Sequence, residues 1–230
     1  MAVIEIEVIY DFVCAWCYIG KRNLDRAIAL HRKVYPDGRS DIFSIEWRPY
    51  YLNYNPHPHS VDKSEVIDER LSNMTSEQRT MLFNRMDQIG RSIGIHFRGG
   101  GKIGSTRDAH RLVHLVQAKS PEPASGGEDT TNIVVEKLFE AYHELEMDIS
   151  DHDVLKEFSV DAGLDPKEVE EWLENDIAMD TGDQEAKQNK DVLMSGVPVC
   201  IVQGKYSFDG STDPWEFLEA FSNARDESQE

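Results

Sequence analysis

Strand-like segments occur only near the two ends of this chain, and this separation restricts the folds that it can adopt. Residues 3–10 and 42–47, and again 199–202 and 206–208, are rich in β-branched and aromatic residues, whereas the middle follows helical spacing. Strands must pair to satisfy their backbone groups. The economical arrangement is one sheet assembled from both ends of the chain, with the helical middle inserted between them.

The first fifty residues form a compact unit in this α/β arrangement. Residues 3–10 predict a strand whose second half is buried on both faces, a helix follows from Cys14 to about His31, and residues 42–47 form the next strand.

Helical spacing continues in residues 63–74, 76–94, 106–119, 132–145, 151–162, 166–175 and 180–194. Asp213 and Pro214 start a last helix to about Ala224. We therefore expect one domain from residues 1–55 and 190–230, and a helical insertion domain from residues 56–189.

The motif Cys14-Ala15-Trp16-Cys17 lies where the first strand meets the first helix. Unpaired N–H groups and the helix dipole favour a thiolate there, so Cys14 is the expected nucleophile. Cys17 falls one turn further on the same helix face, close enough for a disulfide, and is the expected resolving thiol. A zinc half-site or a pair of inert buried thiols would have the same spacing, although no second CxxC motif supplies further zinc ligands.

Two neighbours of the cysteines are candidate site residues. Asp11 could be a buried carboxylate that relays protons to or from Cys17, or an ordinary turn or cap acceptor. Trp16 could shape a substrate surface, or simply pack on an amphipathic helix.

Charge and composition exclude several classes of function. Asp and Glu number 43 against 24 Lys and Arg, which gives a formal net charge of -19 and disfavours nucleic acids and anionic membranes as partners. No apolar stretch approaches the roughly 20 residues that span a bilayer, and the N-terminus lacks a signal-peptide pattern. Three cysteines also argue against a disulfide-stapled secreted protein, so we expect a cytoplasmic location.

No metal site is predicted from the histidines. His110 and His114 are four residues apart on a predicted helix, but no third ligand is evident and the glutamate of an HExxH motif is missing. Cys200, in the first of the late strands, is expected to be a small core residue rather than a third redox thiol.

Several segments spread over nearly the whole chain carry a family resemblance. They are residues 10–21 (YDFVCAWCYIGK), 47–52 (WRPYYL), 106–111 (TRDAHR), 141–142 (AY), 163–165 (GLD) and 196–198 (GVP). Together they resemble the DsbA family of thiol-disulfide oxidoreductases, specifically its FrnE-like branch. The resemblance implies a thioredoxin fold interrupted by a helical insertion.

The same resemblance assigns a role to Val197 and Pro198. It implies a cis-proline loop that faces the cysteines, in which Val197 offers backbone groups to an extended substrate and Pro198 lacks an N–H. The family commonly has proline where this chain has Ala15, so a relative's redox potential does not carry over.

The implied activity is dithiol-disulfide exchange with a disulfide-containing protein or a small-molecule thiol. It requires no bound cofactor, and glutathione is an open co-substrate. Kappa-class glutathione transferases and 2-hydroxychromene-2-carboxylate isomerases share the insertion architecture but usually have serine at the nucleophile position, so a glutathione-dependent transferase or isomerase is the first alternative. A non-catalytic, chaperone-like binding module is the second. A homodimer is compatible with the sequence.

Overall fold

The computed structural model describes residues 1–35, 38–55, 57–119, 129–161, 163–175, 179–193, 196–210 and 212–227. The N-terminal part contains β1 (Val3–Tyr10), α1 (Ala15–Val34), the short 3-10 helix η1 (Gly38–Ser40) and β2 (Ile42–Pro49). The middle contains β3 (Val61–Asp62), α2 (Lys63–Arg70), α3 (Ser76–Ser92), β4 (Lys102–Ile103), α4 (Arg107–Lys119), α5 (Thr130–His143), α6 (His152–Asp161), α7 (Pro166–Glu174) and α8 (Met179–Val192). The C-terminal part contains β5 (Val199–Val202), β6 (Tyr206–Asp209) and α9 (Pro214–Glu227).

The main sheet combines strands from both ends of the chain, in the order β2-β1-β5-β6. β1 runs parallel to β2, with Val3 opposite Ile42, and antiparallel to β5, with Ile6 opposite Val202. β6 pairs with β5 at the edge of the sheet. The predicted α/β sheet, with helices inserted between its two halves, is confirmed. The domain limits at residues 55 and 190 stay a prediction.

β1 is central because its side chains suit burial. Ile4, Ile6 and Val8 are buried, with the more exposed Glu5 and Glu7 between them. From Val8 to Tyr10 every residue is buried, so the second half of the strand is covered on both faces, as predicted.

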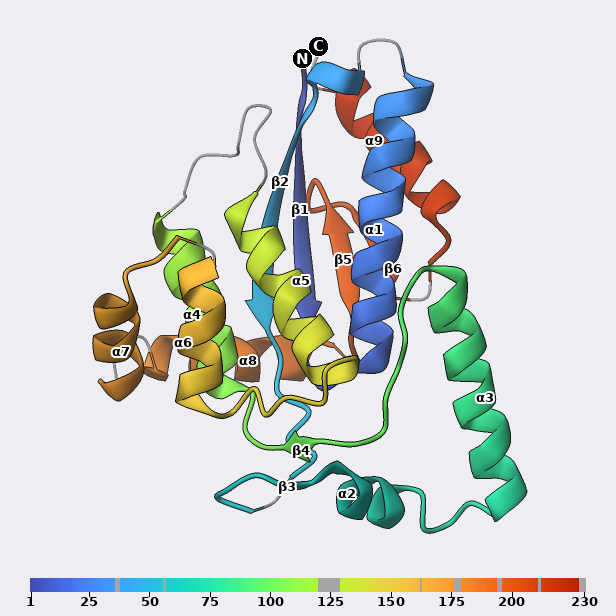
Figure 1. Ribbon diagram of the computed structural model, residues 1–230. Helices are drawn as coiled ribbons and strands as arrows, with labels where there is room; N and C mark the ends of the chain where they lie inside the picture. The colour runs from blue at the N-terminus through green and yellow to red at the C-terminus, as the bar shows by residue number, and fades with distance from the viewer. Residues whose placement is uncertain are drawn as a thin grey trace.

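The helices divide around the sheet (Figure 1). α1 and α9 pack against each other, and α9 also contacts β1 and β5, while α4 and α8 contact β2. The start of β1 and the end of α9 lie towards the top of the view, whereas the N-terminal end of α1 lies at the opposite end of the sheet, beside the C-terminal end of α5. The loop after β1, which carries the cysteines, therefore meets the insertion there.

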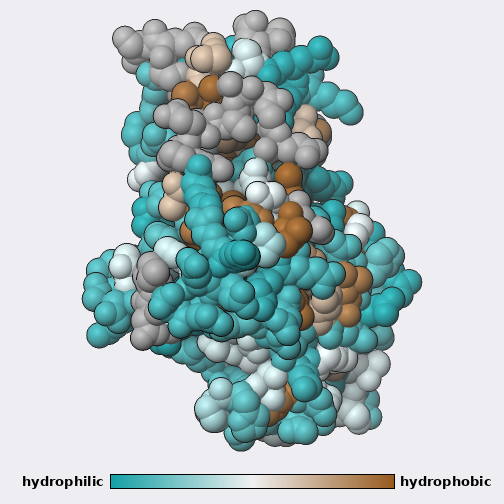
Figure 2. Space-filling view, turned by 60° about the vertical axis from the view of Figure 1, so that its left-hand side comes forward, coloured by the Kyte–Doolittle hydropathy of each residue, from teal (hydrophilic) through white to brown (hydrophobic). Residues whose placement is uncertain are grey.

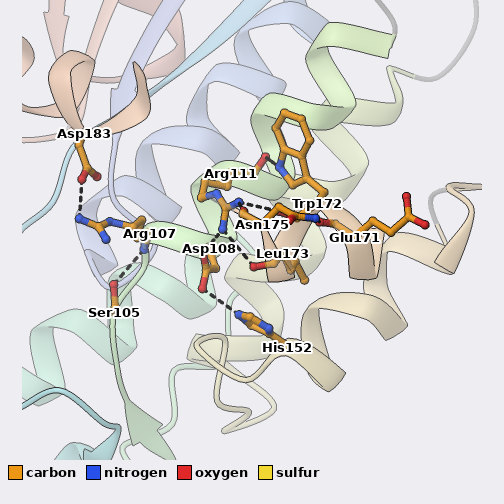
Figure 3. Close-up of polar contacts among 10 residues, drawn as sticks. All are labelled: Ser105, Arg107, Asp108, Arg111, His152, Glu171, Trp172, Leu173, Asn175 and Asp183. Atoms are coloured by element: carbon orange, nitrogen blue, oxygen red, sulfur yellow. Dashed lines mark hydrogen bonds and ion pairs between the residues drawn. The ribbon is translucent and has the colours of Figure 1, made fainter. Parts of the chain in front are cut away.

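A buried arginine joins α4 to α7 in the insertion (Figure 3). Arg111 is buried, and its guanidinium donates to Asp108 Oδ1 at 2.7 Å, to the carbonyl of Trp172 at 2.5 Å and to the carbonyl of Asn175. Trp172 Nε1 donates back to the carbonyl of Arg111 at 3.2 Å. These bonds close the C-terminal end of α7, where helix carbonyls lack intrahelical partners.

The structure adds a short ladder to the predicted elements. Val61 pairs with Ile103 and Asp62 with Lys102, so β3 and β4 form a two-stranded sheet that ties the start of α2 to the segment before α4. Helix limits otherwise agree to within a few residues, although the predicted helix ends at Ala162 and Met194 lie outside the described residues.

The surface agrees with the acidic, polar composition. In Figure 2 hydrophilic residues cover most of the visible face, and the apolar patches between them are small. None of the helices in the described ranges is long and apolar enough to cross a membrane.

Candidate active site

The two cysteines lie at the N-terminal end of α1. Cys14 is the N-cap residue, and its carbonyl accepts the first bonds of the helix, from the N–H groups of Cys17 at 3.0 Å and Tyr18 at 3.3 Å. The Cys14 N–H donates to the carbonyl of Asp11 at 3.1 Å and closes the turn between β1 and α1. Both cysteines are free thiols, and both are buried.

The surroundings make the two thiols unequal. A hydrogen bond from Cys17 lowers the pKa of Cys14, and the backbone N–H groups of Cys17 and Trp16 lower it further, against burial and the negative charge of Asp11. Burial raises the pKa of Cys17 well above its ordinary value, and the interaction with Cys14 raises it again. These opposite shifts favour ionisation of Cys14 over that of Cys17, which is the order that a nucleophile and a resolving thiol require.

A loop far away in sequence faces Cys14. The peptide bond between Val197 and Pro198 is cis, and the Cys14 thiol lies 3.5 Å from the carbonyl oxygen of Val197. Gly210 permits the close packing of this loop, because a Cβ at that position would lie 1.8 Å from Cγ of Pro198. The structure thus brings both members of the predicted loop to the dithiol.

Asp11 contacts the second cysteine through its backbone. It is fully buried, and its N–H donates to Cys17 Sγ at 3.5 Å. One carboxylate oxygen accepts from the N–H of Leu52 at 2.7 Å, and the other lies 3.5 Å from Nε2 of His110. The carboxylate is therefore held by two parts of the chain outside the cysteine loop.

Sequence reasoning missed the part played by His110. Its ring is buried against Tyr10 and Phe12 and reaches Asp11 from α4, whereas His114 stacks on Trp172, with ring centroids 6.4 Å apart. The two histidines point to different neighbours, which no residue spacing could reveal. No group of three His, Cys, Asp or Glu side chains that could hold a metal occurs in the described ranges.

The other candidate residues occupy ordinary positions. Trp16 is half-buried and packs against the core, which fits either of its two predicted roles. Cys200 is buried on β5 opposite Val8, and burial raises the pKa of its thiol to about 12. Cys200 is thus a core residue, as predicted.

Two cation–aromatic pairs, neither predicted, flank the site. Lys63 Nζ lies 3.8 Å from the ring centroid of Tyr142 and donates to the carbonyl of that residue at 2.8 Å. Burial lowers the pKa of this lysine to about 8. The guanidinium of Arg70 lies 3.6 Å from the ring centroid of Tyr54, whose pKa is raised to about 12 by burial and then by the charge of Cys14.

The residue after Tyr142 anchors the cysteine loop itself. His143 Nε2 donates to the carbonyl of Phe12 at 2.9 Å, and both residues are buried. The insertion therefore holds the backbone two residues before Cys14.

Comparison with known proteins assigns the family. The model of the DSBA-like thioredoxin domain matches residues 5–222, which is nearly the whole chain. The chain belongs to the DSBA-like thioredoxin family. This membership supports thiol-disulfide oxidoreductase chemistry in general, and the FrnE-like branch stays a prediction.

Individual members of this family and its structural neighbours are distant in sequence. The Bacillus subtilis protein YwbO is 24% identical over 200 residues, which is 86% of each chain. A probable DsbA oxidoreductase from Streptomyces coelicolor has a similar solved structure, with a TM-score of 0.77, 21% identity, and 97% of this chain and 91% of that chain covered. The cytosolic disulfide reductase DsbM from Pseudomonas aeruginosa, solved with GSH, gives a TM-score of 0.60 at 12% identity, covering 95% and 98%. The two solved structures share the fold of this chain.

Proposed function

We propose that this protein catalyses dithiol-disulfide exchange through Cys14 and Cys17. The observation that carries the proposal is the inequality of the two thiols: the pKa of Cys14 is lowered and that of Cys17 is raised, at the start of one helix. Inert buried cysteines would have no lowered pKa. A zinc half-site would need further ligands, and none gathers near the motif within the described ranges.

The exchange proceeds in two steps that balance. The Cys14 thiolate attacks one sulfur of a substrate disulfide, forms a mixed disulfide and releases the other sulfur as a thiolate. Cys17 then loses its proton and attacks Cys14 Sγ, which forms the Cys14–Cys17 disulfide and releases the second substrate thiolate. The dithiol is oxidised by two electrons, and the substrate is reduced by two. A thiol such as glutathione, two molecules per cycle, would return the dithiol to its reduced form, and no other cofactor is needed.

Neighbouring residues supply the remaining functions of the site. The Val197–Pro198 loop would align an extended substrate at Cys14, with Val197 offering backbone groups and Pro198 offering no competing donor. Trp16 would form part of the surface that the substrate covers. Asp11 would take the proton from Cys17 during the resolving step, because its carboxylate is fully buried and its negative charge acts on the Cys17 thiol.

The reductive direction and a cytoplasmic location belong to this proposal. The similar fold of a cytosolic disulfide reductase is compatible with both. The partners we propose are disulfide-containing proteins or small disulfides, with glutathione as the reductant.

The test is a redox titration of the purified protein in glutathione buffers, with thiols trapped in acid and counted by intact mass. We expect a reversible loss of two hydrogens, unchanged in Cys200→Ala and lost in Cys14→Ser. A midpoint well above about -220 mV would indicate an oxidant or isomerase rather than a reductase.

Two other results would replace the proposal. A stable glutathione adduct without an internal disulfide would favour a glutathione-dependent transferase or isomerase. Full activity in a variant with both Cys14 and Cys17 changed to serine would favour a non-catalytic, chaperone-like module.

A further inference from the structure

A hollow of about 330 Å³ lies between the loop after β2, the start of α4 and one side of α8. Its lining residues are Tyr51, Asn53, Ser105, Arg107, Asp183, Ala186, Lys187 and Lys190. Figure 3 shows Ser105 and Arg107, at the start of α4, and Asp183 of α8, which is 76 positions from Arg107. The volume is at the lower end of the range for small-molecule sites, so it suits part of a small ligand rather than a folded partner.

The charge of the hollow is opposite to that of the protein. Arg107 is paired with Asp183, which leaves the charges of Lys187 and Lys190 in excess. Across the described part of the chain, neither lysine has an acidic side chain as an ion-pair partner. Their convergence on one hollow creates a local positive potential.

Neutral donors complete the lining. The hydroxyl of Ser105 and the amide of Asn53 accompany the two lysines, the Tyr51 hydroxyl is hydrogen-bonded to Asp183, and the buried Ala186 adds an apolar side chain. Ammonium groups together with neutral N–H and O–H donors are the groups that hydrogen-bond a carboxylate.

A short series of contacts links the wall of the hollow to the dithiol. Tyr51 forms part of its wall, and the N–H of the next residue, Leu52, donates to the carboxylate of Asp11. The N–H of Asp11 in turn contacts Cys17 Sγ. The Tyr51 ring also lies 5.6 Å from the ring of His110, which approaches the same carboxylate. The wall of the hollow is therefore joined through Leu52 and Asp11 to the segment that carries the dithiol.

We propose that this hollow binds a carboxylate of a small disulfide or thiol substrate while the sulfur of that substrate reacts at Cys14. The inference rests on the proposed exchange function and adds the substrate class: small carboxylated disulfides are preferred over uncharged ones. Lys187 and Lys190 determine this preference and take no part in the bond changes, in which the Cys14 thiolate displaces one substrate thiolate and Cys17 displaces the other.

The experiment compares two disulfide probes with the reduced full-length protein. One is 5,5′-dithiobis(2-nitrobenzoate), which has a carboxylate on each half, and the other is 2,2′-dithiodipyridine, which has no charge. The second-order rate constant is measured for the wild type and for the double variant Lys187→Gln/Lys190→Gln. A matched control, Lys33→Gln/Lys167→Gln, removes the same charge at two exposed sites elsewhere.

We expect the double variant to react roughly 2- to 30-fold more slowly with the carboxylated probe, the range that two exposed ion pairs provide. Its rate with the neutral probe should equal that of the wild type, and the control should equal the wild type with both probes. At about 1 M salt, where the screening length is about 3 Å, the difference should largely vanish.

Three results would overturn the inference. An unchanged rate with the carboxylated probe would mean that the lysines do not bind it. An equal decrease in the control would assign the effect to net charge, and an equal decrease with both probes would assign it to folding of the site. Failure of the exchange proposal is distinguishable, because the Cys14→Ser variant would then react with the neutral probe as fast as the wild type.

Discussion

Acid should destabilise this protein through one histidine at the site, His143. Its ring is buried between Tyr18 and Phe97, and its Nε2 donates to the carbonyl of Phe12. Burial, and then the positive charge of Lys63, lower the pKa of His143 from 6.5 to about 3. The native protein therefore holds this ring neutral at pH values where the unfolded chain protonates it.

The size of the effect follows from proton linkage. Between pH 6.5 and about 3 the unfolded state binds one more proton at His143 than the native state does. Each unit of acidification in this window therefore favours unfolding by about 1.4 kcal/mol. At pH 8 both states are neutral and the contribution is negligible. At pH 5 the histidine should have lowered the free energy of unfolding by about 2 kcal/mol.

The assay is urea unfolding followed by circular dichroism at several pH values between 8 and 5. The comparison variant is His143→Gln, whose amide keeps a donor for the Phe12 carbonyl but does not titrate. Groups common to both proteins cancel in the difference. The wild type should lose about 2 kcal/mol more than the variant over this range. Parallel losses in the two proteins would refute the reasoning.

Three further predictions concern single side chains. Arg111→Met removes the cation of a buried hydrogen-bond network. The free energy of unfolding, measured by urea titration, should therefore fall by about 3–5 kcal/mol. A loss below about 1 kcal/mol would contradict this prediction. Cys17→Ala removes the hydrogen bond that most lowers the pKa of Cys14. The ultraviolet absorbance of the Cys14 thiolate should therefore appear at higher pH than in the wild type. If the midpoint of this pH titration does not rise, the hydrogen bond does not have the assigned effect. Gly210→Ala places a methyl group against Pro198. The rate of exchange with a neutral disulfide should fall, and the free energy of unfolding should fall by about 1–3 kcal/mol. A wild-type exchange rate would show that the loop need not pack so closely.

The elements that could be predicted are those whose residue pattern is visible within one short stretch of the sequence. β1 shows alternation followed by a fully apolar end, and the cysteines of α1 follow it directly, so both the strand and the site were evident from the sequence. That strands from the two ends of the chain share one sheet followed from a simple requirement, because they need partners, but the pairing of β1 with β5 was not predicted.

The contacts that were missed join separate elements. β3 and β4 are two residues each, too short to show a period, and they form only because the segments around residues 61 and 103 meet. His110 was considered as a metal ligand because its spacing from His114 is local, whereas its contact with Asp11 spans 99 positions. Lys63 shows no signal at all, since its burial depends on Tyr142 in another helix.

The position of β1 between β2 and β5 has a consequence for synthesis of the chain. Cys14 and Val197, which meet in the folded protein, are 183 positions apart. At ordinary translation speeds, roughly 10–40 s separate their emergence from the ribosome. Throughout that interval β1 can pair with β2 alone, and its other edge has no strand to cover it. The nascent chain thus presents an open strand edge beside an uncovered dithiol, a combination that makes it vulnerable to aggregation and to premature oxidation until β5 is complete.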